Sequence, residues 1–201
     1  MFLLKLKNTL IGVSFIVISF FLSDCVSLST LNTVQTINKG TMCGNIGLGP
    51  LPEIGGRYGL SSRSDFGMKV AFPGTIFMDF KTEVTRSPFI TSMDLGYSVF
   101  TWTGTDDNRY FIHALYPMIM IGRENWYLGV KKILLNPYEL TIREDIEQHG
   151  FRNTSDPIIS TGYVFNVAQG VRILTEVNIL TGEELKESAI LPGLGFEFEL
   201  K

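Results

Sequence analysis

The stretch Asp65-Phe-Gly-Met-Lys-Val-Ala-Phe72 and its continuation Thr75-Ile-Phe-Met-Asp-Phe-Lys-Thr-Glu-Val-Thr85, separated by Pro73-Gly74, decide the fold. Apolar residues occupy every second position on both sides of the Pro-Gly pair. Because successive side chains of a β-strand point to opposite faces, this period of two indicates two amphipathic strands joined by a tight turn. The polar face of the pair carries charges, among them Lys69, Asp79, Lys81 and Glu83.

The same alternation continues outward in both directions, from Thr41 to the end of the chain. It predicts ten strands, at 41–49, 53–60, 65–72, 75–85, 89–102, 110–122, 126–135, 157–168, 171–180 and 190–200. Residues 136–156 have mixed periodicity and are predicted as a long loop with a short helix or hairpin inside. The predicted fold class is all-β, an antiparallel up-and-down meander that closes into a β-barrel of about ten strands.

The connections between these strands differ in length. Four are short, at 61–64, 86–88, 123–125 and 169–170, and three others are longer, at 103–109, 136–156 and 181–189. Short turns at one end and longer loops at the other are typical of outer-membrane barrels. An even number of strands also predicts that both ends of the barrel lie at the short-turn end, next to an anchor in the inner leaflet of that membrane.

The first 25 residues predict where the protein is sent. Lys5 and Lys7 precede an apolar core of about 13 residues, Leu10 to Leu22, which is shorter than the roughly 20 residues that a spanning helix needs. A basic head and a short apolar core predict a signal peptide at 1–24. The remaining organisation is a polar tether at 25–40 and a β-barrel domain at 41–201.

The end of this core, Leu22-Ser23-Asp24-Cys25, resembles the lipobox of bacterial lipoproteins. In that family a leucine and two small residues precede a cysteine that is acylated and becomes the mature N-terminus. Asp24 departs from the usual Gly, Ala or Ser, although relaxed versions occur in spirochaete-like lipoproteins. The resemblance implies lipidation at Cys25 and attachment to the bacterial outer membrane without a transmembrane helix. The alternative is a secreted protein that is cut elsewhere.

The ladder of Gly-x-Gly and aromatic strands over 41–201 resembles bacterial outer-membrane β-barrel proteins in general, and this resemblance implies no functional residue. In such a barrel the apolar face meets lipid and the polar face lines the lumen. The polar face also collects glycines, which would make room in a narrow lumen for charged side chains. The lumen charges predicted in this way are Arg57, Lys69, Asp79, Lys81, Glu83, Arg172, Glu176 and Glu197.

Two alternatives remain open at this point. The first is a lipid-tethered soluble barrel, lipocalin-like, whose apolar interior binds a hydrophobic ligand. The second is an enzyme that modifies membrane lipid. Some outer-membrane acyl hydrolases have a strand histidine followed closely by a serine, but His113 is followed by Ala114, Leu115 and Tyr116, so that match fails.

Composition and motifs exclude several classes of protein. The net charge is −3 and there is no basic block, so the sequence lacks the positive charge that nucleic-acid binding requires. With only two cysteines, a disulfide framework is excluded. His113 and His149 have no second ligand at metal spacing, and no Ser-His-Asp, Gly-x-Ser-x-Gly or phosphate-binding pattern occurs. We therefore expect no catalytic residue, metal or cofactor, and a structural or surface role in the cell envelope with the membrane as partner.

Two further expectations concern Pro117 and four aromatic residues near strand ends. Pro117 lies inside the sixth predicted strand and implies a bulge or an edge there, because proline cannot donate to a strand ladder. Four aromatic residues near strand ends could form an interfacial girdle or simply pack in the core: Trp102, Tyr110, Trp126 and Tyr127.

Overall fold

The computed structural model describes residues 31–49, 51–72, 74–103, 109–140, 152–153, 157–180 and 189–200. The predicted signal peptide, Cys25 and His149 lie outside these ranges. No helix among the described residues is long and apolar enough to cross a membrane.

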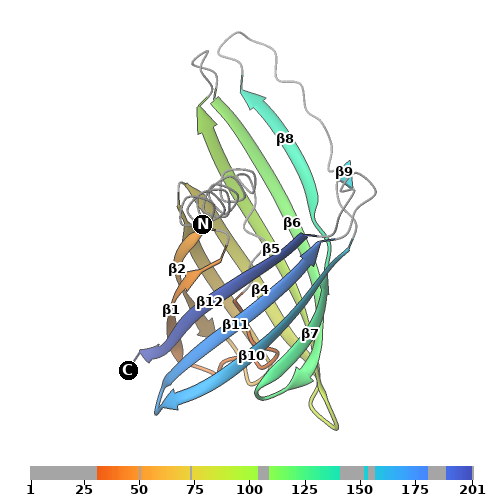
Figure 1. Cartoon of the computed structure of the whole chain (residues 1–201). Helices are drawn as coiled ribbons and strands as arrows, with labels where there is room; N and C mark the ends of the chain where they lie inside the picture. The colour runs from red at the N-terminus through yellow and green to blue at the C-terminus, as the bar shows by residue number, and fades with distance from the viewer. Residues whose placement is uncertain are drawn as a thin grey trace, which may run out of the picture.

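The described chain is built of strands, which Figure 1 shows as a tilted barrel. They are β1 (Met42–Leu48), β2 (Pro52–Gly59), β3 (Ser64–Ala71), β4 (Thr75–Thr85), β5 (Ile90–Thr103), β6 (Arg109–Arg123), β7 (Trp126–Lys131), β8 (Leu134–Leu140), β9 (Arg152–Asn153), β10 (Ile158–Ala168), β11 (Val171–Leu180) and β12 (Ala189–Leu200). All pairings are antiparallel. They join neighbours in the chain except at three places: β1 pairs with β12 where the barrel closes, β10 pairs with β7, and β6 pairs with β8 as well as with β7.

The sheet closes between its first and last strands, where Met42 of β1 pairs with Leu200 of β12 and Leu48 with Leu194. The ring runs β1, β2, β3, β4, β5, β6, β7, β10, β11, β12, with β8 continuing the line of β7 along the upper part of β6. The short β9 pairs with β8 outside the ring. The predicted all-β meander of ten strands closing into a barrel is therefore confirmed.

The break between β7 and β8 occurs at Pro117. Met118 pairs with Lys131 and Leu115 with Leu134, so the register does not shift across the break. Pro117 accepts a hydrogen bond from the Lys132 backbone N–H at 3.0 Å but has no N–H to return, and the ladder loses a rung. The expectation of a bulge at Pro117 is thus wrong, because the register is continuous. The expectation of an edge holds locally, because Tyr116 and Pro117 pair with β5 and have no Cα partner in β7 or β8.

The two rims of the barrel differ as predicted. One rim carries the turns 60–63, 86–89, 124–125 and 169–170, together with the start of β1 and the end of β12; we call it the short-turn end. The opposite rim, the long-loop end, carries the connections 104–108, 141–151 and 181–188, as well as the tight turns at 49–51 and 72–74. Strands β5, β6 and β8 rise beyond the barrel wall at the long-loop end (Figure 1).

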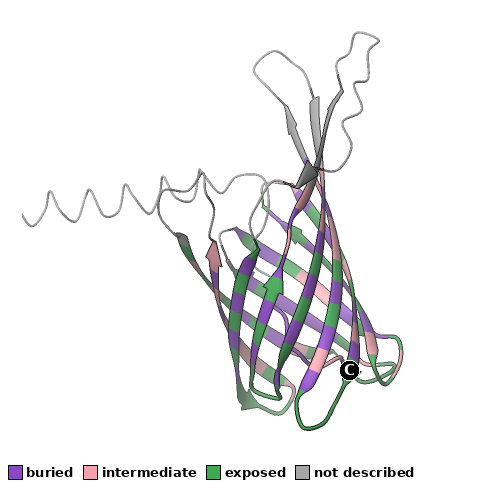
Figure 2. Cartoon of the chain, turned by 90° about the vertical axis from the view of Figure 1, so that its right-hand side faces the viewer, coloured by how far each residue is buried: buried purple, intermediate pink, exposed green. Residues whose placement is uncertain are grey.

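Burial alternates along each strand, and Figure 2 shows it as bands of buried and exposed residues around the wall. The exposed set is apolar, for example Met68 at 52%, Leu95 at 55% and Val130 at 50% exposed. The buried set faces the lumen and is rich in charge, with Asp65 and Lys81 both at 0%. The barrel is therefore apolar outside and polar inside.

Candidate functional site

The lumen gathers charged side chains from most of the wall. The eight predicted lumen charges all point inward or to its mouth: Arg57, Lys69, Lys81, Glu83, Glu176 and Glu197 are buried, while Asp79 and Arg172 are half-buried. The structure adds four buried charges that were not among them: Glu53, Asp65, Asp94 and Lys131. The interior of the barrel is thus a charged layer between its two rims.

A network centred on Arg57 crosses three neighbouring strands. Its guanidinium donates to Asp65 Oδ1 at 2.5 Å and lies 2.6 Å from Asp79 Oδ2, while Lys81 Nζ lies 3.5 Å from Asp65 Oδ2. Side-chain exposure in this network is 5% for Arg57 and 0% for Asp65 and Lys81. Burying an unpaired charge costs free energy of folding, so removing one member of this network would leave its partners buried and uncompensated.

A segment that is not part of the barrel wall lies in the lumen and completes this network. Residues 31–38, which we call the luminal segment, lie inside the barrel and are buried or half-buried except at Asn38. Lys81 Nζ donates to Asn32 Oδ1 at 2.9 Å and to the backbone carbonyls of Thr33 at 2.8 Å and Gln35 at 2.6 Å. The sequence predicts a polar tether here, yet the described part of it docks in its own barrel.

Three wall carboxylates also bind the luminal segment. Asn32 Nδ2 donates to Asp94 Oδ2 at 2.8 Å, and the Ile37 backbone N–H donates to Asp65 Oδ2 at 2.9 Å. Glu83 Oε1 accepts from the backbone N–H of Thr36 at 2.6 Å and from its hydroxyl at 2.7 Å. The polar residues that suggested a solvated tether are therefore the groups that pair with the lumen.

Apolar and glycine contacts fix the ends of the luminal segment. Val34, which is 2% exposed, packs in a cluster with four wall residues, Ile90, Met118, Met120 and Tyr127. Gly59 leaves space for the Asn38 backbone, which a Cβ at that position would overlap. Gly47 and Gly195, which face each other across β1 and β12, leave the same kind of space for the Leu31 side chain.

Other inward glycines make room for large polar side chains, as the sequence predicts. A Cβ at Gly67 would meet Asp79 and Arg57, one at Gly55 would meet Lys69, and one at Gly162 would meet the Tyr127 ring. Tyr127 donates to Glu176, which also accepts from Asn178 Nδ2 at 2.6 Å. A residue with a side chain at these positions would displace the charged layer.

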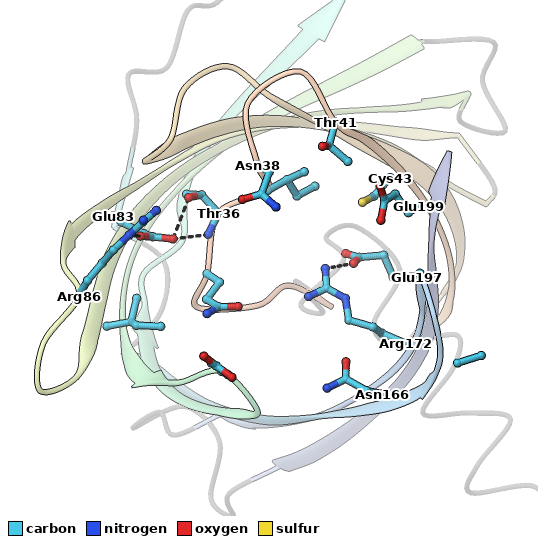
Figure 3. A pocket seen from close by; sticks show the side chains of 16 residues that line it. Thr36, Asn38, Thr41, Cys43, Glu83, Arg86, Asn166, Arg172, Glu197 and Glu199 are labelled. Atoms are coloured by element: carbon cyan, nitrogen blue, oxygen red, sulfur yellow. Dashed lines mark hydrogen bonds and ion pairs between the residues drawn. The ribbon is translucent and has the colours of Figure 1, made fainter. Parts of the chain in front are cut away.

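The short-turn end of the lumen is hollow, and Figure 3 shows it with the luminal segment inside the ring of strands. The cavity has a volume of about 590 Å³. Its side chains are mainly polar, with the pair Arg172–Glu197 on one side and Arg86–Glu83 on the other. The long-loop end is instead filled by an apolar cluster: Leu51, Ala71, Phe77, Ala114, Tyr116, Ile133 and Ile158.

The four added charges could partly have been found from the sequence. Glu53, Asp65 and Asp94 occupy the same alternating face as the predicted set, so the period-two pattern already contained them. Lys131 was obscured by Lys132 beside it; the structure places Lys131 inward at 1% exposed and Lys132 half-buried on the outer face. The luminal segment had no such signal, because its docking depends on residues distant in the chain.

The histidine and aromatic candidates lie elsewhere. His113 is half-buried on the outer face, where its Nδ1 pairs with the Tyr97 hydroxyl. Trp126 is 40% exposed at the outer rim beside Phe89, with ring centroids 6.4 Å apart, whereas Tyr127 points into the lumen. The side chains of Trp102 and Tyr110 lie outside the described residues. No group of three or more metal-ligating side chains occurs in the part of the chain that the structure describes.

No protein-family model matches the chain, and no curated protein is similar to it in sequence. The site must therefore be interpreted from its own chemistry. That chemistry is a closed, self-paired charged interior inside an apolar exterior.

Proposed function

We propose that this protein is a bacterial outer-membrane lipoprotein whose barrel spans the bilayer and whose lumen is closed by its own N-terminal segment. Its role is structural or at the cell surface, without catalysis. The observation that carries the proposal is the apolar outer wall. Large apolar side chains stand exposed on every strand whose outer face is described, from 36% for Val171 to 66% for Ile190.

Water is a poor solvent for such a wall. Soluble monomers rarely expose contiguous apolar patches above a few hundred Å², and a larger patch marks a protein or membrane interface. In a bilayer the same wall is favourable, because closed barrels satisfy every backbone hydrogen bond internally and turn apolar side chains to lipid. An exposed aromatic cluster of Phe89, Trp126 and Tyr163 at the short-turn rim suits the membrane interface.

The shorter strands also fit this arrangement. β1, β2 and β3 have seven or eight residues, slightly fewer than the 9–11 usual for a spanning strand. Leu60 and Phe72, in the turns beyond β2 and β3, are 45% and 73% exposed and extend the apolar wall past the strand ends. The apolar band on this side is thus taller than the strands alone.

The lipocalin-like alternative needs an apolar cavity inside the barrel. The 590 Å³ cavity has a mainly polar lining, and the apolar cluster at the long-loop end is packed with side chains. A hydrophobic ligand would have to displace buried ion pairs to enter the centre. These features favour the membrane barrel over the soluble one.

The lipid anchor is proposed from Leu22-Ser23-Asp24-Cys25 alone. Acyl chains contribute about 0.8 kcal/mol per buried methylene, and two chains suffice for stable anchoring. We expect the wild type to incorporate labelled palmitate and the Cys25→Ala variant to incorporate none. A wild type without label, matured normally in globomycin, would contradict lipidation.

The barrel is tested separately from the anchor with a Cys25→Ala variant directed to the periplasm by a standard cleavable signal. After a carbonate wash, we expect this unlipidated variant to sediment with outer membranes as the wild type does, because its strands span the bilayer. Release of the variant while the wild type stays would show that the lipid is the only anchor, and would overturn the spanning barrel.

A further inference from the structure

The luminal segment runs the length of the barrel in one direction. At its upper end, Leu31 lies over Gly47 and Gly195, one residue from the end of β1 at the long-loop rim. At its lower end, Gly40 N–H donates to Gly59 O at 2.8 Å, where β2 ends at the short-turn rim. The chain therefore enters β1 only after crossing the lumen from the opposite side.

The contacts between these ends lie lower in the lumen than Leu31. Asn32, Thr33 and Gln35 bind Lys81. Ile37 binds Asp65, the register partner of Lys81, and Thr36 binds Glu83, two residues closer to the short-turn end of β4. The direction of the segment is therefore given by its two ends, Leu31 beside Gly47 and Gly195 and Asn38 beside Gly59, and the segment is threaded through the barrel antiparallel to β1.

We propose that the chain is threaded through its own barrel, so that Cys25 leaves at the long-loop end and its lipid enters the leaflet on that side. This inference rests on the proposed function for the membrane and the lipid. Outer-membrane barrels turn their longer loops outward, so the anchor lies in the outer leaflet. The first strand begins and the last strand ends at the short-turn end, as the sequence predicts. The sequence also predicts the lipid anchor beside them, in the inner leaflet, whereas threading places it at the opposite, long-loop end.

Chain length and free space support this direction. Leu31 follows Cys25 by six positions, which span at most about 20 Å in an extended chain, and this suffices to clear the nearby rim. A return to the short-turn end would have to pass alongside the luminal segment and the buried charged side chains that bind it, Lys81, Asp94 and Asp65. Most of the apolar cluster at the long-loop end comes from β3, β4, β6 and β10, whereas Leu31 packs against β1 and β12.

The first experiment compares the two sides of the membrane with one epitope tag in three full-length variants. The tag is inserted after Ser27, after Gln148 in a long connection, or between Glu124 and Asn125 in a short turn. Intact and permeabilised cells are probed with an antibody. We expect the tag after Ser27 to match the tag after Gln148 and to differ from the short-turn tag.

A tag after Ser27 that instead matches the short-turn tag would overturn the threading. If all three tags are equally accessible in intact cells, no membrane separates the loops, and the proposed function fails. Threading is then decided by a second measurement that needs neither membrane nor lipid.

That measurement is disulfide formation in the purified Cys25→Ala, Cys43→Ser background. Leu31→Cys with Gly195→Cys should form an intramolecular link on oxidation, seen as a reducible shift in gel mobility. Leu31→Cys with Asn166→Cys, which lies at the short-turn mouth, is the matched control and should stay unlinked. Linking of the control pair alone would place Leu31 at the wrong end and overturn the threading.

Discussion

Each strand residue faces either the apolar outer wall or the crowded charged lumen, so the effect of a substitution depends on which side its side chain faces. Leu95 and Asp94 are adjacent in β5, yet Leu95 is 55% exposed outside and Asp94 is 7% exposed inside. The outer positions distinguish a bilayer from water, because a charged substitution there costs much more stability in a bilayer than in water.

Leu95→Lys is the sharpest test of the outer wall. In a bilayer, a lysine near the midplane of a barrel lowers the free energy of unfolding by about 2–4 kcal/mol. On a surface in water, such a change is usually within about ±0.5 kcal/mol. Urea unfolding of the protein refolded into vesicles measures the difference. Thr85→Lys, at the short-turn rim, is the control and should cost about 0–1 kcal/mol; equal effects of the two substitutions would contradict a lipid-facing wall.

The inner charges depend on complete pairing. Arg57→Met strands Asp65 and Asp79, and we expect it to lower the free energy of unfolding by about 3–5 kcal/mol, as for other broken buried pairs. Arg172→Met breaks a pair whose arginine is 26% exposed, and should cost about 1 kcal/mol or less. Denaturant titration compares them. Adding Asp79→Asn to Arg57→Met should recover part of the loss; no recovery would mean that the arginine acts by packing.

At the scale of elements, the luminal segment is an integral part of the folded barrel, in addition to the ten strands of the ring, and not a linker. It has no strand ladder of its own, so its position depends on side chains of β3, β4 and β5 that bind its backbone and amides. Lys81 is central because one ammonium group meets three acceptors of the segment.

Lys81→Met should therefore release the luminal segment while leaving the wall paired. We expect faster proteolytic cleavage between residues 31 and 38 in the purified variant, because two hydrogen bonds to the backbone of this segment and one to the Asn32 side chain are lost. Arg172→Met again serves as the control, since its salt-bridge partner Glu197 belongs to the wall. Equal cleavage rates in both variants and the wild type would show that Lys81 does not hold the segment.

At the scale of the whole molecule, the lumen of the barrel is obstructed and does not form an open channel. The luminal segment occupies its centre, the apolar cluster occupies much of the long-loop end, and the 590 Å³ cavity lies at the short-turn mouth. A ten-stranded barrel is narrow, and its inner side chains leave little free cross-section.

We therefore expect the wild type to conduct no ions when it is reconstituted into planar bilayers. The physical reason is that buried side chains and the luminal segment block the path between the two rims. A water-filled porin measured in the same bilayers is the positive control. Stepwise currents from the wild type would contradict a closed lumen.

The sequence by itself determined the ten-stranded ring and, for most of its residues, the face on which they lie, but not the division of 126–135 into β7 and β8. These features depend on a period of two and on turn residues such as Pro73-Gly74, and both are local properties of the chain. The same alternation contained the luminal positions of Arg57, Lys81 and Glu176. What it could not decide was whether the apolar face pointed in or out, because alternation is identical in both cases.

Only the tertiary structure decided that question and the place of the luminal segment. Closure of β1 on β12 sets the curvature of the sheet, and curvature determines which face becomes the interior. Residues 31–38 carry no periodic pattern, and their partners Asp65, Lys81 and Asp94 are 28 to 62 positions away. Contacts at such separations depend on closure of the barrel and not on the neighbouring sequence. The polar stretch that the sequence predicts as a tether therefore lies in the lumen and fills part of it.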